Sequence, residues 1–351
     1  MVGSLGKLFL GGVTADSRAA TFTDGVALPE YVFVCFQRTF AAITPALVLG
    51  GLVERMKFST IVIWTVLWSL IVYYPIAHMV WWSDGYLFGL GALDFAGGTV
   101  VHINAAVSAL VGVLMLGKRT GFPRERMVPH SLSLTLAGAG LLWVGGFGFN
   151  AGSALEANGT AALAMINTFT ATAAAAVAWM LAEWAGGHKT SLLGAASGVI
   201  AGLVAITPTA GNAGPFGAIL LGAVASLVCY GFVTGLKVRL GLDDSLDAFG
   251  IHGLGGMVGS VLTAVTMLPA LGGPGKADYA LGPQLVTQLI VTAVAILWAG
   301  IGSALVFGLL KVTMGLRVSD EVERRGSTSP NTASEHTIIE DLSSPPCKGG
   351  D

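Results

Sequence analysis

Residues 97–117 read GGTVVHINAAVSALVGVLMLG, a run of twenty-one residues without Asp, Glu, Lys or Arg. A helix rises about 1.5 Å per residue, so this run is long enough to cross the roughly 30 Å hydrocarbon core of a bilayer. His102 is the one ionisable side chain within it. The stretch therefore predicts a membrane-spanning helix that carries a histidine at membrane depth.

Eight further apolar segments of similar length flank this run. The nine predicted spans cover approximately residues 30–53, 58–80, 97–117, 131–152, 160–184, 190–207, 215–236, 248–268 and 284–315. A closed β-barrel would instead need segments of roughly ten residues with alternating polarity, and these are missing from the sequence. The sequence predicts an all-α polytopic membrane protein, a helical bundle.

Composition supports this class and excludes others. Of the 351 residues, 54% are hydrophobic and 11% are charged, whereas soluble domains carry about 25% charged residues. A formal net charge of -2 offers no basic surface for nucleic acid. The three cysteines, Cys35, Cys229 and Cys347, lie too far apart for a disulfide framework or a metal-binding motif. We expect no enzyme activity, cofactor or metal.

Basic residues in the connections predict the orientation, because Lys and Arg are retained on the cytoplasmic side. They occur in alternate connections, at Arg55, Lys57, Lys118, Arg119, Arg124, Arg126, Lys189, Lys237, Arg239, Arg317, Arg324 and Arg325. The first predicted span then enters from outside and the C-terminus is cytoplasmic. This gives three regions: an extracytoplasmic loop over 1–28, a membrane domain over 29–316 and a cytoplasmic tail over 317–351, which we expect to be disordered from about 327 because it is rich in Ser, Thr and Pro.

Two histidines lie within predicted spans, His102 in GGTVVHINAA and His252 in AFGIHGLGG. Ionisable groups at membrane depth are costly, so each needs a reason. A neutral imidazole has one donor and one acceptor nitrogen, so two imidazoles can bond to each other and still face a lumen. One alternative is a core histidine bonded to a backbone carbonyl. A metal site is the other, but it lacks further ligands at comparable depth.

Aromatic residues and one aspartate accompany the histidines. Phe36 and Phe40 share a helical face, Trp81 ends the second span, and Phe149 precedes Ser153 by four residues. Such rings can face lipid or form an interfacial belt, or they can enclose a small cation with the Ser153 hydroxyl as an acceptor. Asp94, just before the His102 span, can cap that helix or hold a nearby cation electrostatically. The capping role is the one we favour.

Six segments, in this order along the chain, resemble the Amt/Mep/Rh ammonium transporter family, and most closely its bacterial Amt branch. They are FQRTFAAITPALVLGGLVERMKFS from Phe36, PIAHMVW from Pro75, GALDFAGGTVVHINAA from Gly91, GFGFNAGSA from Gly146, SLLGAASGVIAGLVAITP from Ser191 and DAFGIHGLGGMVGS from Asp247. Long ordered runs of this kind are far more specific than a single short motif.

The resemblance implies a role for each matching residue. Phe36, Phe40, Trp81 and Ser153 match the family's external ammonium site. Phe40 and Phe149 match its stacked phenyl gate, while His102 and His252 match its twin-histidine pore. Asp94 matches a buried aspartate near the external site. Members of the family are homotrimers in the cell membrane, surrounded by lipid, with two inverted five-helix repeats and one further helix in each subunit. The implied function is ammonium transport, with deprotonation of NH4+ and passage of NH3.

The sequence departs from the family pattern at both ends. Nine spans are predicted where the family has eleven, and GSLGKLFLGGV resembles the loop after the second helix, so we expect the first two helices to be missing. The residues from Ser327 do not resemble the family's tail, which argues against regulation by a PII-type protein. An ammonium sensor or a nonconducting gene remnant is the main alternative. A neutral-solute channel for water or CO2 is a third hypothesis.

Overall fold

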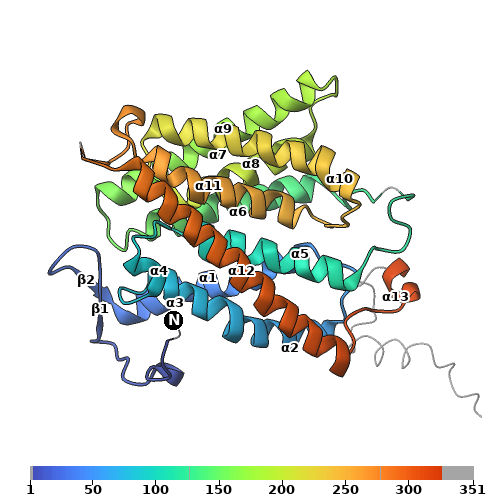
Figure 1. The fold of residues 1–351 in the computed structure, drawn as a ribbon, viewed down its shortest axis with the longest axis horizontal. Helices are drawn as coiled ribbons and strands as arrows, with labels where there is room; N and C mark the ends of the chain where they lie inside the picture. The colour runs from blue at the N-terminus through green and yellow to red at the C-terminus, as the bar shows by residue number, and fades with distance from the viewer. Residues whose placement is uncertain (1–2, 126, 277, 326–351) are drawn as a thin grey trace, which may run out of the picture.

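The computed structural model describes residues 3–125, 127–276 and 278–325, and most of these residues are helical (Figure 1). Nine helical segments in this described part are long and apolar enough to cross a membrane. The prediction of an all-helical polytopic membrane protein is confirmed. The tail beyond residue 325, including the segment predicted to be disordered, lies outside the described residues.

The elements of the described part follow one another along the chain in a simple order. A short antiparallel hairpin, β1 (Arg18–Ala20) with β2 (Ala27–Pro29), precedes the first span and pairs Arg18 with Pro29. The α-helices are α1 (Glu30–Gly50), α2 (Phe58–Trp68), α3 (Tyr74–Trp81), α4 (Tyr86–Gly89), α5 (Asn104–Leu116), α6 (Leu132–Gly152), α7 (Gly159–Ala185), α8 (Leu192–Ile206), α9 (Pro215–Gly231), α10 (Lys237–Leu240), α11 (Leu254–Thr266), α12 (Leu281–Thr313) and α13 (Asp320–Arg325). Four π-helical segments are η2 (Ser69–Tyr73), η3 (Gly98–Ile103), η5 (Phe232–Leu236) and η6 (Phe249–Gly253), and three 3-10 turns are η1 (Leu8–Leu10), η4 (Thr207–Thr209) and η7 (Pro269–Leu271).

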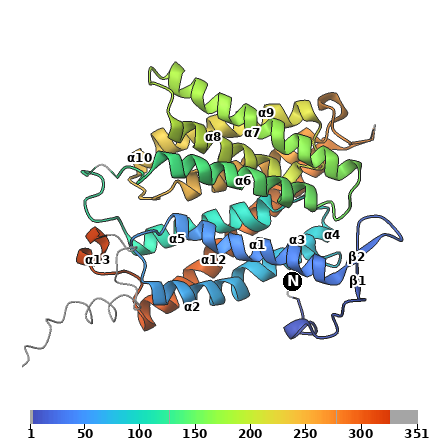
Figure 2. The same ribbon diagram turned by 180° about the vertical axis from the view of Figure 1, so that it is seen from behind.

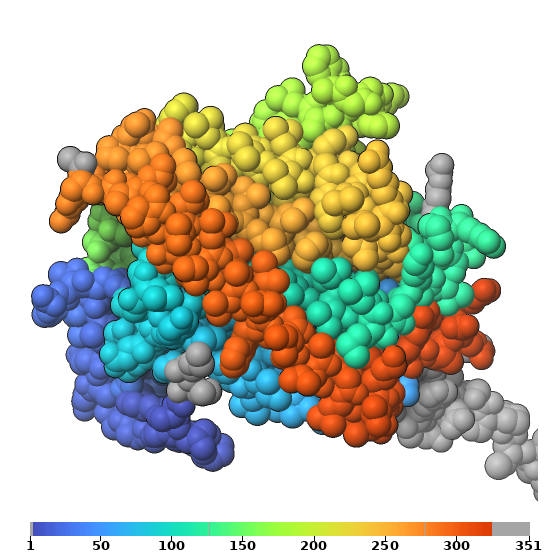
Figure 3. All heavy atoms as spheres, viewed as in Figure 1, coloured from blue at the N-terminus to red at the C-terminus, as the bar shows by residue number. Residues whose placement is uncertain are grey.

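The helices form two groups that lie side by side in both ribbon views (Figures 1 and 2). One group contains α1, α2, α3 and α5, and the other contains α6 to α11. Helix α12 packs against α2 and α5 of the first group and against α11 of the second, and Figure 3 shows it running diagonally across both. The segments η3 and η6 meet where the groups join.

Aromatic stacking fills the core of the first group. Trp64 lies between Trp68 and Phe307, with ring centroids 5.3 Å away on each side. The indole N–H of Trp68 is 3.0 Å from the hydroxyls of both Ser108 and Ser303, which satisfies a buried donor. These contacts fasten α2, α5 and α12 together.

Glycines bring the helices of the second group into backbone contact. A Cβ added to Gly202 on α8 would lie 2.7 Å from the Cα of Thr172 on α7, and one on Gly259 would lie 2.3 Å from the carbonyl oxygen of Ala205. Neither position has room for a side chain. Close approach of helices at small residues is typical of packing between membrane-spanning helices.

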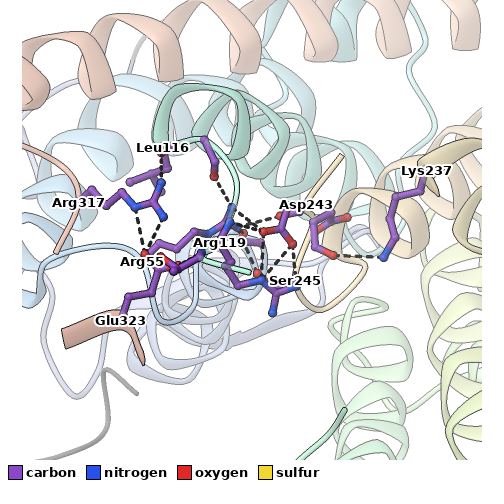
Figure 4. Close-up of polar contacts among 12 residues, drawn as sticks. Arg55, Leu116, Arg119, Lys237, Asp243, Ser245, Arg317 and Glu323 are labelled. Carbon is purple, nitrogen blue, oxygen red and sulfur yellow. Dashed lines mark hydrogen bonds and ion pairs between the residues drawn. The ribbon is translucent and has the colours of Figure 1, made fainter. Parts of the chain in front are cut away.

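Charged and polar side chains gather where several connections meet at one end of the bundle (Figure 4). This loop cluster consists of Arg55, Arg119, Asp243, Ser245, Arg317 and Glu323. The buried Asp243 carboxylate is 2.6 Å from the Arg119 guanidinium and 3.5 Å from that of Arg55. Glu323 on α13 pairs with Arg317 at 2.7 Å and accepts the N–H of Thr120 at 2.7 Å. The cluster thereby joins the α1–α2, α5–α6 and α10–η6 connections to the segment after α12.

Replacing Arg119 with lysine is expected to destabilise the protein by about 1–2 kcal/mol, because an ammonium cannot reproduce the forked contact with a buried carboxylate. Burial raises the pKa of Asp243, but the hydrogen bonds and charge of Arg119 and the charge of Arg55 lower this pKa more, so it lies below its usual value. The stabilisation by Asp243 is thus complete above about pH 4 and is lost as the pH falls through the folded-state pKa. Thermal melts of the wild type and of Arg119→Lys, in detergent from pH 8 to pH 3, measure this pH dependence. A difference in melting temperature between the two proteins that already decreases between pH 7 and pH 5 would contradict the prediction.

Candidate functional site

Each predicted histidine lies in a π-helical segment that leads into a membrane helix. His102 is in η3, ahead of α5, and His252 is in η6, ahead of α11. An aspartate stands eight residues before each histidine, Asp94 before His102 and Asp244 before His252. The two halves of the site therefore have the same local construction.

The two aspartates cap the π-helical segments. Asp94 accepts the backbone N–H groups of Gly97 and Gly98 at 2.9 and 2.6 Å through one oxygen, and those of Thr99 and Val100 at 2.9 and 3.0 Å through the other. Gly97 has φ +107°, and a Cβ there would lie 2.7 Å from the Val101 side chain. Glycine is thus required at this turn.

Asp244 makes the equivalent cap in the second half and was not predicted from the sequence. Its carboxylate accepts the N–H groups of Ala248 and Phe249 at 3.0 and 2.8 Å and that of Gly250 at 3.3 Å. The sequence did hold a signal, because Asp-x7-His occurs at both 94–102 and 244–252. Matched functional residues in internal repeats are common in transporters.

The structure brings the two histidines into direct contact. Their Nδ1 atoms are 3.2 Å apart, and the rings lie at 24° with centroids 5.2 Å apart. The Nε2 atom of His102 is 3.3 Å from the Thr207 hydroxyl at the end of α8. Thr207 was also not predicted as a site residue, although it lies in the quoted segment SLLGAASGVIAGLVAITP.

A narrow cavity connects this pair to the predicted aromatic gate. Its polar lining comes from His102, His252, Thr207 and Asn150. Apolar residues and glycine make up the rest, namely Phe40, Ile43, Leu47, Ala96, Val101, Leu142, Gly146, Phe149, Ile200, Leu203 and Val204. Such a conduit disfavours a bare cation and tolerates a small neutral molecule.

Aromatic side chains from three helices meet at the other end of the cavity. The Phe40 ring centroid lies 5.1 Å from that of Phe36 and 5.2 Å from that of Trp81, both in edge-on arrangements. Phe40 and Phe149 are 4.8 Å apart and tilted by 57°. The two gate rings are thus not stacked in parallel as the resemblance implied. Tilted and edge-on contacts suit ring quadrupoles better than a face-to-face sandwich does.

Ser153 lies beside this aromatic group. Its hydroxyl donates to the Phe149 carbonyl at 2.8 Å, which leaves its lone pairs available to accept a hydrogen bond. The preceding Gly152 packs against Phe36, since a Cβ there would lie 2.9 Å from the ring. The Trp81 indole N–H donates to the Asp94 carbonyl at 2.9 Å, which joins the aromatic group to the capped turn. All the predicted site residues therefore belong to one connected group, in which Phe40, Phe149, His102 and His252 line the cavity and the others contact the aromatic end.

Metal-ligating side chains do not gather in the part of the chain that the structure describes. No group of three or more His, Cys, Asp or Glu residues is close enough there to hold a metal ion. The imidazole nitrogens of His102 and His252 that face each other are bonded together. The arrangement favours handling of a small polar molecule and its protons.

The fold is that of a multi-pass helical membrane protein, and the site is an apolar conduit. Together they place the protein in the class of transporters and channels. The family model described as "Ammonium Transporter Family" matches residues 7–333. The chain belongs to this family.

Relatives and solved structures agree with this assignment. The chain is 49% identical over 295 residues to the ammonium transporter of Aquifex aeolicus, which covers 84% of this chain and 69% of that protein. It is 42% identical over 302 residues to the ammonium transporter of Bacillus subtilis, covering 85% and 74%. The crystal structure of Saccharomyces cerevisiae Mep2 superposes with a TM-score of 0.77 at 35% identity, covering 84% of this chain and 69% of that one. A structure described as "Sensor Amt Protein" gives a TM-score of 0.79 at 30% identity, covering 86% and 77%.

Proposed function

We propose that this protein transports ammonium across the cell membrane, by binding NH4+ at an external aromatic site and conducting NH3 past His102 and His252. The observation that carries the proposal is one apolar cavity that links the Phe40–Phe149 pair to two histidines in contact. The membership of the family, with relatives named as ammonium transporters, supports the same substrate.

Phe36, Phe40 and Trp81 are assigned the recruitment of the cation, with Ser153 as a hydroxyl acceptor. A desolvated cation over an aromatic face gains about 2 kcal/mol. Ammonium also has directional N–H donors, which a potassium ion of similar size lacks. In this proposal the Ser153 oxygen accepts one of them, since its own proton is donated to the Phe149 carbonyl.

Below the Phe40–Phe149 gate, the neutral molecule is the permeant form. Carrying a bare charge through an apolar lumen costs several kcal/mol, whereas NH3 loses only hydrogen bonds. Ammonium therefore gives up a proton to water on the outer side of the gate, and NH3 passes the imidazole pair and takes a proton from water on the far side. No covalent bond to the protein forms in this scheme, so the role is not enzymatic.

Uptake into proteoliposomes tests the proposal. The full chain is reconstituted in lipid vesicles, and entry of labelled methylammonium is followed together with internal pH and membrane current. We expect saturable uptake that unlabelled ammonium suppresses and potassium does not. A well-assembled protein that takes up no methylammonium would exclude transport. A protein that binds methylammonium but does not let it enter the vesicles would instead favour the sensor or nonconducting alternative. The described residues contain no observation that favours this alternative over transport.

A neutral-solute channel makes a different prediction for the aromatic site. Water and CO2 carry no charge that could interact with a ring, so a neutral-solute channel should keep its permeation when Phe40 and Trp81 are both replaced. If the protein transports ammonium as proposed, the same double replacement should lower methylammonium uptake. Measuring water and methylammonium fluxes on the same vesicles separates these two hypotheses.

Replacing Trp81 with leucine is expected to raise the half-saturation concentration for methylammonium about ten- to thirtyfold, since a desolvated cation–π contact is lost. Trp82→Leu is the matched control. Trp82 is 54% exposed and absent from the aromatic contacts with Phe40, so its removal should leave the half-saturation concentration within about twofold. Concentration-dependent uptake measures both variants. Equal shifts in the two would remove Trp81 from the recruitment site.

In this proposal the orientation in the membrane and the oligomeric state follow the family pattern. The basic connections, including Arg55 and Arg119, face the cytoplasm, and the chain assembles as a homotrimer in the lipid bilayer. The sequence from Ser327 onward makes docking of a PII-type regulator unfavourable. Mass measurement of the assembled protein in detergent and protease protection of the C-terminus in vesicles test the oligomer and the orientation.

A further inference from the structure

The Thr207 hydroxyl determines which nitrogen of His102 carries a proton. A hydroxyl has a single hydrogen to donate. In Thr207 this hydrogen is used on the Leu203 carbonyl oxygen, one helical turn back, at 2.7 Å. The same oxygen is 3.3 Å from His102 Nε2. Because its proton is committed, Thr207 accepts from His102, and His102 Nε2 must be the protonated nitrogen.

The protonation of His102 then fixes that of His252. A neutral imidazole protonated at Nε2 has a bare Nδ1. His102 Nδ1 lies 3.2 Å from His252 Nδ1, so the hydrogen between them belongs to His252. The Nε2 of His252 is left without a hydrogen, and the described residues supply no hydrogen-bond partner for it. His252 lines the cavity, so this lone pair is available to the permeant molecule.

We propose that Thr207 is a positioning residue that holds the histidine pair in one tautomeric arrangement, with His102 protonated at Nε2, His252 protonated at Nδ1, and His252 Nε2 as the acceptor of the pair. Thr207 itself is not required to contact the permeant molecule. Its effect passes through His102.

The backbone around Thr207 keeps this hydroxyl in place. The Thr207 carbonyl accepts the N–H of Ala96 at 3.1 Å, and the Pro208 carbonyl accepts the N–H of Phe95 at 3.0 Å. Both donors belong to the turn that Asp94 caps ahead of His102. The end of α8 and the turn before η3 are thus bonded to each other, which keeps the backbones that carry the hydroxyl and the imidazole close together.

The arrangement makes the two histidines unequal toward the permeant molecule, and this consequence rests on the proposed transport function. NH3 donates a hydrogen bond to His252 Nε2, while His102 offers no free acceptor. A proton that enters the pair is likewise accepted at His252 Nε2, and the hydrogen between the two Nδ1 atoms can then shift to His102. The two histidines therefore have different roles although they are held by matching segments.

Nitrogen-15 NMR of the full chain with labelled histidine, in lipid vesicles at neutral pH without ammonium, tests the assignment. Protonated and bare ring nitrogens resonate in separate regions, and the other histidines are assigned by replacing each in turn. Wild type should show His102 protonated at Nε2 and His252 at Nδ1, as one form. Thr207→Val should add the opposite arrangement, shifting the ratio of the two by about tenfold, and Thr207→Ser should restore the single form.

Thr263→Val serves as the matched control. Thr263 is fully buried and also donates its hydroxyl to the carbonyl four residues back, Gly259, at 2.8 Å, but it contacts neither histidine. This variant should keep the wild-type pattern. The opposite tautomers in wild type, or an unchanged pattern in Thr207→Val, would overturn the proposal. The spectra require no transport, so the expected pattern without methylammonium uptake would refute the proposed function and leave the tautomer assignment standing.

Discussion

Asp94→Asn is expected to cost several kcal/mol of stability and most of the transport activity. The carboxylate accepts four backbone N–H groups, two on each oxygen. An asparagine keeps one oxygen and turns an NH2 group toward the other two donors. Each buried N–H left without an acceptor costs about 1–3 kcal/mol, against a typical total stability of about 5–15 kcal/mol. Asp94→Ala, which removes all four acceptor contacts, should not assemble.

The matched control is Asp24→Asn, the same change at an exposed position in the hairpin turn. Thermal melting by size-exclusion chromatography measures stability, and methylammonium uptake measures function. The result also decides between the two roles weighed for Asp94. If Asp94→Asn melts like Asp24→Asn but has a raised half-saturation concentration, the aspartate acts on the cation and the capping role is secondary.

His102→Leu and His252→Leu are each expected to lower methylammonium uptake at least about thirtyfold without preventing assembly. Leucine fills a similar volume in the apolar cavity. At His252 it removes the acceptor for NH3, and an unbonded polar molecule in an apolar medium loses about 2 kcal/mol or more. At His102 it removes the partner that holds His252 through the Nδ1–Nδ1 contact. The double variant should be no worse than either single one, because each single change already breaks the Nδ1–Nδ1 contact. Initial uptake rates per assembled protein provide the measurement.

His78→Leu is the control for these variants. His78 stacks on Trp82 at the end of α3 and does not line the cavity, so uptake should stay near the wild-type rate. The proposed pathway would be wrong if either pore variant folded normally and transported at the rate of His78→Leu.

Much of the fold followed from local sequence. A run of about twenty apolar residues must be a helix in lipid, because every backbone polar group has to be satisfied within the segment. All nine spans could therefore be placed without tertiary information. The histidine candidates could also be selected one by one, since an ionisable side chain is unusual in a membrane span. The aromatic candidates could not, because rings in such spans commonly face lipid or form an interfacial belt. The resemblance to a family then supplied their grouping.

Other features could not be read from single segments. The tilt of Phe40 against Phe149, the stack of Trp64 with Phe307 and the cluster around Asp243 join residues more than a hundred positions apart. Asp244 was overlooked because a carboxylate in a connection is ordinary, and only the repeated eight-residue spacing before a histidine distinguishes it. Thr207 gave no signal, since a threonine near a helix end is common.

Local sequence is enough to show that this chain is a helical membrane protein with two histidines at membrane depth, because the cost of exposing backbone and charge to lipid belongs to each segment separately. The contact between the two imidazoles, and the contact of His102 with a hydroxyl that donates to the Leu203 carbonyl, arise only in the folded chain. Hydrogen-bond direction depends on all partners of an atom together. In this protein those partners come from η3, η6 and the end of α8.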